Sequence, residues 1–293
     1  MKRHDKLPLK KAYYRIFTGM IVIPLVLVLV LSLVILGMQY REQAIENIRG
    51  VQKGVAAELQ SDVDFMSMRL SQLINVNDNM VIQYAVAMNE ADQDARYDAQ
   101  KKLDQAGNMV IEPVKDVVSI GFYMKNGNAF FLKSSIKRTI EETRAKQWYQ
   151  DALQNLNSVK IGSYQTRKAS DLYLGGSRDQ LVLIYALSPN SMIDRSQSVE
   201  MVVLYQTSDA GNAIRNYNRN YIRGNNKLGI MQIVGENGEA IYKTEEIAVK
   251  AARGYTCVRT PIELENATWY IESYIRTAEL MQDFVKIALV ILL

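Results

Sequence analysis

The stretch Ile16–Met38, IFTGMIVIPLVLVLVLSLVILGM, decides how the rest of the chain is interpreted. It contains no charged side chain. As an α-helix it is about 35 Å long, enough to cross the hydrocarbon core of a bilayer, which is about 30 Å thick. Pro24 does not exclude this, because membrane helices tolerate proline where neighbouring groups bind the freed carbonyl. We therefore predict a transmembrane helix over residues 16–38.

A cleaved signal peptide is the alternative interpretation of this stretch. Signal peptides have an apolar region of about 7–15 residues and a cleavage site of small residues. The run here is longer, and Gln39–Glu42 continues as helix-forming sequence without an Ala-x-Ala pattern. A retained anchor is therefore favoured.

The charges beside the apolar stretch predict its orientation. Residues 1–15 contain six basic side chains and one acidic side chain, whereas the flank after residue 40 is balanced. Because basic flanks stay on the inner side of a membrane, we expect a cytoplasmic tail over residues 1–15. Residues 40–280 are then extracellular, and the protein resides in the cell membrane.

Composition limits the chemistry that the outer part can perform. The chain of 293 residues has a net charge of +4, which comes from the basic tail, so no nucleic-acid partner is indicated. The single cysteine, Cys257, permits no intrachain disulfide, and the single histidine, His4, lies in the tail. A histidine-containing triad and a histidine-based zinc site are thereby excluded outside the membrane. No nucleophile–base pair, metal cluster or nucleotide loop stands out, so we predict no enzymatic activity and no cofactor.

Residues 39–115 are predicted to be helical. A long helix extends from Tyr40 to about Ile74, and shorter helices follow over residues 80–88 and 92–112. Apolar residues of the long helix recur mostly three, four or seven positions apart: Ile45, Ile48, Val55, Leu59, Met66, Leu70 and Leu73. Such a stripe indicates core packing or a coiled coil, and in the second case it would join two protomers of a homodimer.

After residue 116 the pattern becomes that of strands. Asn126-Gly127 and Asn237-Gly238 are strong hairpin signals, each between two strand-like segments. The expected strands cover residues 117–124, 129–133, 160–164, 180–188, 199–207, 229–234, 239–243, 255–264 and 268–275. Helices are expected over residues 141–155, 209–221 and 244–252. The repetition predicts an α+β fold with two tandem antiparallel modules, 116–208 and 209–280, beside one long helix.

Residues 284–293 are apolar except for Lys286. Ten residues are too few to span a bilayer. We expect them to begin the second membrane helix of a longer parent protein.

This layout resembles the double Cache extracellular sensor region of bacterial transmembrane sensor histidine kinases of the Gram-positive type. The local pieces that support the resemblance are Lys146-Gln147-Trp148-Tyr149, Gly235–Glu239 and Asn266–Ile271. It implies PAS-like sheets and a two-component receptor that passes a ligand-induced change through its membrane helices. Two alternatives stay open: the input region of a chemotaxis or cyclic-dinucleotide receptor, and a membrane-anchored surface adaptor without a small ligand.

The resemblance also implies a ligand pocket between the first sheet and the segment around Trp148. The candidate ligand-binding residues are Tyr123, Lys146, Trp148, Tyr149 and Tyr185. The branch of the family that binds amino acids has an arginine where this chain has Lys146, and an acidic residue near the end of the last strand. This chain has Tyr205-Gln206-Thr207 there. The partner is therefore left as a sugar, an organic acid, an amino acid or a solute-binding protein.

Overall fold

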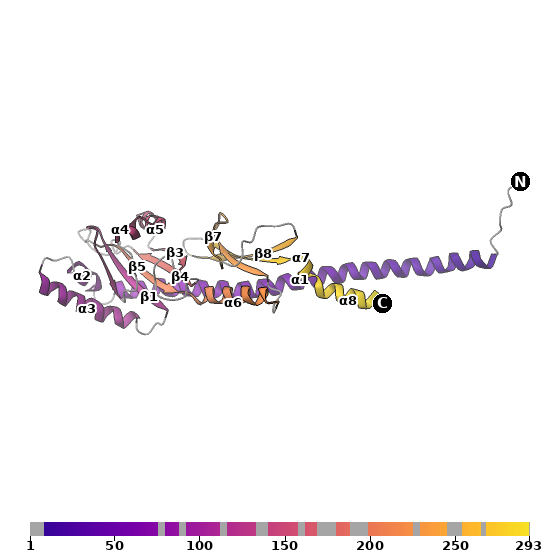
Figure 1. The fold of residues 1–293 in the computed structure, drawn as a ribbon, viewed down its shortest axis with the longest axis horizontal. Helices are drawn as coiled ribbons and strands as arrows, with labels where there is room; N and C mark the ends of the chain where they lie inside the picture. The colour runs from indigo at the N-terminus through magenta and orange to yellow at the C-terminus, as the bar shows by residue number, and fades with distance from the viewer. Residues whose placement is uncertain are drawn as a thin grey trace.

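The computed structural model shows an elongated molecule built along a single helix (Figure 1). Two β-sheets lie beside one half of this helix, and its other half extends beyond the sheets towards the N-terminus. The structure describes residues 9–75, 80–87, 92–111, 116–132, 140–157, 162–168, 180–187, 199–224, 229–244, 254–264 and 268–292.

Helix α1 (Leu9–Asn75) is continuous over 67 residues. It joins the predicted apolar segment to the predicted outer helix, and Pro24 lies within it. Among the described residues, α1 is the one helix long and apolar enough to cross a membrane, judged by length and composition. The side chains of its most apolar window are not buried by the rest of the chain.

The first sheet has five antiparallel strands in the order β2-β1-β5-β4-β3. Its strands are β1 (Val117–Met124), β2 (Ala129–Leu132), β3 (Gly162–Lys168), β4 (Leu181–Leu187) and β5 (Val199–Thr207). Gly127 has a φ of +101° in the β1–β2 turn, a conformation that glycine adopts without strain. With helices α2 to α5 this sheet forms the distal module, which lies farthest from the N-terminus (Figure 1).

The second sheet has the order β7-β6-β9-β8. Its strands are β6 (Ile230–Val234), β7 (Ala240–Tyr242), β8 (Tyr255–Glu263) and β9 (Thr268–Arg276). In both sheets the first strand pairs with its hairpin partner and with the last strand of the sheet. This shared topology confirms the predicted repetition. The second sheet, with α6 and α7, is the proximal module.

The shorter helices largely follow the prediction, with one difference. They are α2 (Met80–Ala87), α3 (Gln93–Ile111), α4 (Ile140–Arg144), α5 (Gln147–Asn157), α6 (Asp209–Ile222), α7 (Thr277–Leu280) and α8 (Gln282–Leu292). The helix expected over residues 141–155 is two helices, because the chain turns at Ala145 and Lys146. Nearly all of the helix expected over residues 244–252 lies outside the described residues.

The apolar stripe of α1 is part of the protein core. Val55, Leu59 and Met66 are at most 3% exposed, and they pack in one cluster with residues of both sheets and of α6. The stripe therefore joins the two modules of a single chain. Of the two uses that the sequence leaves open, the structure thus shows core packing, and a homodimer, which stays a prediction, would need another surface.

Helix α8 returns beside the apolar half of α1 (Figure 1). The rings of Phe284 and Tyr40 are 6.4 Å apart. A Cβ atom at Gly37 would come within 3.0 Å of the Phe284 ring, so the glycine permits this close approach. The two helices thus pack together where the apolar segment ends.

Candidate ligand-binding site of the distal module

Helices α4 and α5 cover the face of the distal sheet that is turned away from α1 (Figure 1). Alternate residues of the strands point to this face, as Val182, Ile184 and Ala186 do in β4. Helix α5 contributes Trp148 and Tyr149 to the same cluster. The amphipathic character of α5 thus places two aromatic side chains against the sheet.

Four aromatic rings form the centre of this cluster. The rings of Tyr123 and Tyr149 are 5.1 Å apart, and those of Trp148 and Tyr205 are 6.2 Å apart, both in edge-on arrangements. The hydroxyls of Tyr123 and Tyr205 are hydrogen-bonded at 2.7 Å. Burial raises the pKa of Tyr123 to about 12 and that of Tyr205 well above its usual value. Both phenols therefore keep their protons at neutral pH, and one donates to the other.

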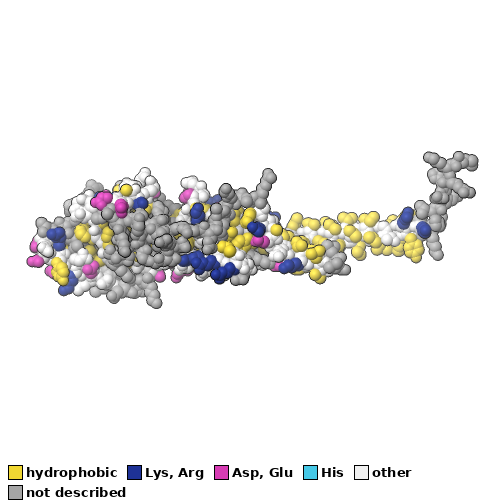
Figure 2. Space-filling model, viewed as in Figure 1, with side chains coloured by type: hydrophobic (Ala, Val, Ile, Leu, Met, Phe, Trp, Pro, Cys, Tyr) yellow, Lys and Arg dark blue, Asp and Glu magenta, His cyan; other side chains and the backbone are white. Residues whose placement is uncertain are grey.

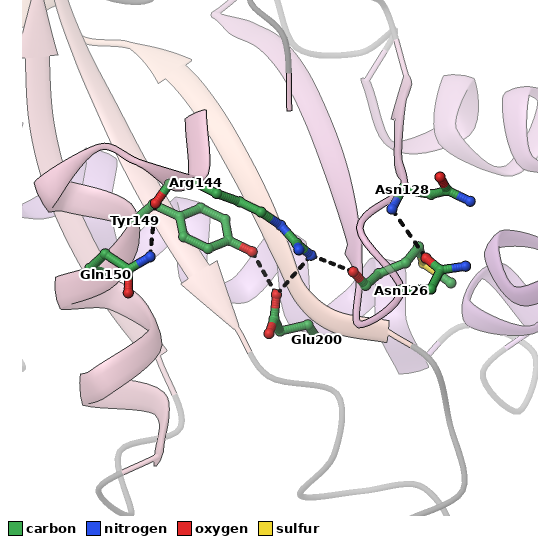
Figure 3. A network of polar contacts seen from close by, with 7 residues as sticks. Asn126, Asn128, Arg144, Tyr149, Gln150 and Glu200 are labelled. Carbon is green, nitrogen blue, oxygen red and sulfur yellow. Dashed lines mark hydrogen bonds and ion pairs between the residues drawn. The ribbon is translucent and has the colours of Figure 1, made fainter. Parts of the chain in front are cut away.

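An ionic network adjoins the rings (Figure 3). The Tyr149 hydroxyl donates to Glu200 Oε2 at 2.7 Å, and Arg144 Nη2 lies 3.1 Å from the same oxygen. Arg144 Nη2 also donates to the carbonyl of Met124, at the end of β1. Burial and the hydrogen bond to Glu200 raise the pKa of Tyr149. The site thus contains a cation, an anion and a neutral phenol in direct contact.

One polar atom of this network lacks a partner. Arg144 Nε is buried and makes no hydrogen bond in the structure. A buried donor without an acceptor costs about 1–3 kcal/mol, so an oxygen atom placed beside it would be stabilised.

The local structure positions this network. The turn after β1 is closed by a hydrogen bond from Asn128 N to Asn126 Oδ1 at 3.1 Å (Figure 3). Gln150 Nε2 donates to the carbonyl of Arg144 at 2.8 Å, so α5 holds the end of α4. Arg144 is the last residue of α4, directly before the break, and its guanidinium reaches β1 and β5.

The structure brings together three of the five predicted site residues. Tyr123, Trp148 and Tyr149 share the cluster beneath α5. The side chain of Lys146 is exposed and lies outside this cluster. Its backbone carbonyl accepts a hydrogen bond from the N–H of Tyr149 at 3.0 Å, where α5 begins. Tyr185 lies on the opposite face of the sheet, where its hydroxyl donates to Ser67 Oγ of α1 at 3.1 Å.

Two residues of the network, Arg144 and Glu200, were missed by the sequence analysis. The acidic residue was sought at the end of β5, and it lies at the second position of that strand. Glu200 is the one charged residue in the strand VEMVVLYQT, and this isolated charge was the available signal. The cation was sought at Lys146, and the guanidinium in the site comes from two positions earlier in the chain.

Comparison with known proteins supports the fold. No family model matches the sequence. No curated protein matches it either. Among solved structures, the extracellular domain of vpHK1S-Z8, assigned as a histidine kinase, is similar with a TM-score of 0.51 and 11% identity, over 84% of this chain and 96% of that one.

Two chemoreceptor domains are also similar. The ligand-binding domain of Pseudomonas fluorescens CtaA, solved with L-isoleucine, has a TM-score of 0.43 and 13% identity, over 83% of this chain and 96% of that one. The corresponding domain of Pseudomonas aeruginosa PctB, solved with L-Arg, has a TM-score of 0.49 and 12% identity, over 81% and 97%. At such identities the likeness concerns the fold, and the predicted α+β fold with two antiparallel modules beside a long helix is confirmed.

Proposed function

We propose that this chain is the extracellular ligand-sensing region of a membrane-anchored signal-transduction receptor, and that a small ligand binds between α5 and the distal sheet. The observation that carries the proposal is the continuity of α1. This helix contains the apolar segment and packs, further along, on both modules. A ligand can bias such a receptor only through a difference in its affinity for two conformations of the distal module.

The ligand-binding part of the proposal is supported by the Arg144–Glu200 network. A ligand oxygen that approaches the buried Arg144 Nε would compete with Glu200 for the guanidinium. Because Tyr149 donates to Glu200, a change in this ion pair would be passed to α5. Sugars, organic acids and amino acids all carry suitable oxygen atoms.

A screen of thermal stability tests the ligand site. We expect one of these compound classes to raise the unfolding temperature of the full chain in detergent. At a concentration of 100 Kd the shift should be about 5–10 °C, since binding then contributes about 2.7 kcal/mol and each kcal/mol is worth about 2–4 °C. Arg144→Met should abolish the shift, because it removes the guanidinium and keeps an apolar stem.

The control for this screen is Arg259→Met, which removes an arginine from the proximal sheet, where it stacks on the ring of Tyr270. Its ligand-induced shift should equal that of the parent chain. A full shift in Arg144→Met would place the ligand elsewhere. Silence of every compound class would favour a surface adaptor over a small-molecule receptor.

The proposed topology can be tested with the chain's own cysteine. Cys257 is exposed on β8, and a membrane-impermeant maleimide should label it in intact cells. Burial raises the pKa of this thiol, so the labelling is best performed at about pH 8 or above, where more thiolate forms. The control is a Cys257→Ser chain with His4→Cys, which should react only after lysis. Protection of Cys257 in intact cells would contradict an extracellular location.

Within this class we favour a sensor histidine kinase as the parent protein, on the resemblance of layout described above. The kinase activity would belong to a separate cytoplasmic region, and we propose that the outer part itself catalyses no reaction. Among the described residues, no group of three or more histidine, cysteine or acidic side chains is arranged to hold a metal ion.

A further inference from the structure

A cavity of about 730 Å³ lies at the end of the proximal module that adjoins the apolar half of α1. It is open on one side and is lined by the end of α6, the first residues of β6 and β8, and the segment from β9 into α8. The side chains that matter for its chemistry are Tyr221, Ile222, Tyr255, Arg276, Glu279 and Gln282. It is separate from the distal site, which lies in the other module.

The guanidinium of Arg276 is the chief polar group of this cavity. Its Nε donates to the Tyr255 hydroxyl at 3.0 Å, whereas its Nη1 is 3.8 Å from Glu279 Oε1, too far for a hydrogen bond. The other oxygen of Glu279 accepts from the Tyr221 hydroxyl at 2.5 Å. Within the described part of the chain, Nη1 of Arg276 is thus ion-paired with Glu279 without a hydrogen bond, and an external anion could compete with this carboxylate for the guanidinium.

A row of arginines lies on α6, the end of which lines the cavity. Arg215, Arg219 and Arg223 are four residues apart on α6 and so share one face of that helix. Figure 2 shows Lys and Arg side chains gathered over α6. Ile222 lines the cavity and is three residues from Arg219, whereas the three arginines themselves are not among the lining residues. The charged side chains that line the cavity are one cation, Arg276, and one carboxylate, Glu279, and the arginines of α6 add positive charge on the neighbouring helix.

The position of the cavity points to the bilayer surface. Gln282 is two residues before Phe284, which packs on Gly37 inside the apolar segment. Two helical residues rise about 3 Å, and the headgroup layer on each side of a bilayer is about 5–8 Å thick. Gln282 therefore lies at the level of the headgroups in a membrane-anchored chain.

We propose that this cavity binds the phosphate of a phospholipid headgroup in the outer leaflet, with Arg276 as its main ligand. A guanidinium binds phosphate oxygens through paired N–H groups, and tyrosine rings are well suited to the membrane interface. The arginines of α6 add positive potential on the adjoining helix. Because α7 and α8 follow Arg276 directly, a bound headgroup would fix the proximal module against the membrane helices. The inference rests on the proposed membrane anchoring.

Hydrogen exchange of the full chain tests this inference. The chain is purified in dodecyl maltoside, whose headgroup contains no phosphate, and receives phosphatidylglycerol, diacylglycerol with the same acyl chains, or glycerol phosphate. We expect phosphatidylglycerol alone to slow exchange in residues 219–224 and 276–282, by about 3–10-fold, as binding at several times Kd predicts. Native mass spectrometry should show the lipid retained.

Variants assign the effect to the cavity. Arg276→Gln should remove most of the protection, and Arg276→Lys should keep part of it, because lysine retains the charge and loses the paired geometry. Arg259→Gln, on the same sheet outside the cavity, should behave as the parent chain. Equal protection by diacylglycerol would show that acyl chains suffice, and equal protection by glycerol phosphate would show a site for soluble anions; either result overturns the proposal.

If none of the three compounds slows hydrogen exchange in these segments, the inference is also overturned. The proposed function would be unaffected by that result, because labelling of Cys257 in intact cells tests the anchoring separately.

Discussion

Replacing Gln52 with leucine is expected to destabilise the full chain by about 2–4 kcal/mol, because buried polar partners of the glutamine are left unpaired. The unfolding temperature should fall by roughly 4–16 °C, at about 2–4 °C for each kcal/mol in a domain of this size. Gln52 belongs to α1 and is fully buried. Differential scanning calorimetry of the chain in detergent gives the measurement.

The cause is a set of hydrogen bonds between α1 and the proximal sheet. Gln52 Nε2 donates to the carbonyl of Val258 at 2.9 Å and to Ser273 Oγ at 2.8 Å, and Gln52 Oε1 accepts from the Thr260 hydroxyl at 2.6 Å. Leucine has a similar volume and can replace none of these bonds. Gln60→Leu, at an exposed position of the same helix, is the matched control and should change stability by less than about 0.5 kcal/mol.

The result bears on signalling as well as on stability. The bonds of Gln52 fix the position of α1 along strands β8 and β9, so α1 and the proximal sheet should move as one body. A change at the distal site would then reach the membrane through α1 and this sheet together. If Gln52→Leu were as stable as Gln60→Leu, the contact would not fix α1 on the sheet.

Replacing Leu59 with alanine should cost about 2–5 kcal/mol, the usual range for removing a buried leucine side chain. Leu59 is fully buried on α1, in the cluster that includes residues of both modules. Urea unfolding of the full chain measures the loss. Met68→Ala is the control, because Met68 is on the same helix and is 47% exposed.

This substitution separates the two uses of the apolar stripe that the sequence allows. If the stripe packs within the core of one chain, Leu59→Ala lowers the stability of the chain and leaves its oligomeric mass unchanged. In a coiled coil between protomers, it would lower the fraction of dimer. Loss of dimer, measured by light scattering, with little loss of stability in the single chain would contradict the packing described above.

The sequence predicted the parts of the fold that depend on neighbouring residues. The helix over residues 40–74 followed from apolar spacing without a break, and the two hairpins followed from Asn-Gly turns. Local geometry decides such elements, so a short stretch contains the needed information. The face on which a side chain lies was harder to predict. Strand β4 is buried on both faces, so no alternation of polar and apolar residues showed that Tyr185 points towards α1.

By itself, the sequence determined three features: the apolar segment, the long helix that continues from it, and the two strand-rich modules that follow. These features depend on composition and short-range periodicity, which a sequence shows directly. Only the tertiary structure decided the candidate site. Arg144 and Glu200 are 56 residues apart, and they meet because β5 pairs with β1, and the guanidinium at the end of α4 reaches both strands. Contacts of this kind depend on how elements pack, and no short stretch of sequence specifies them.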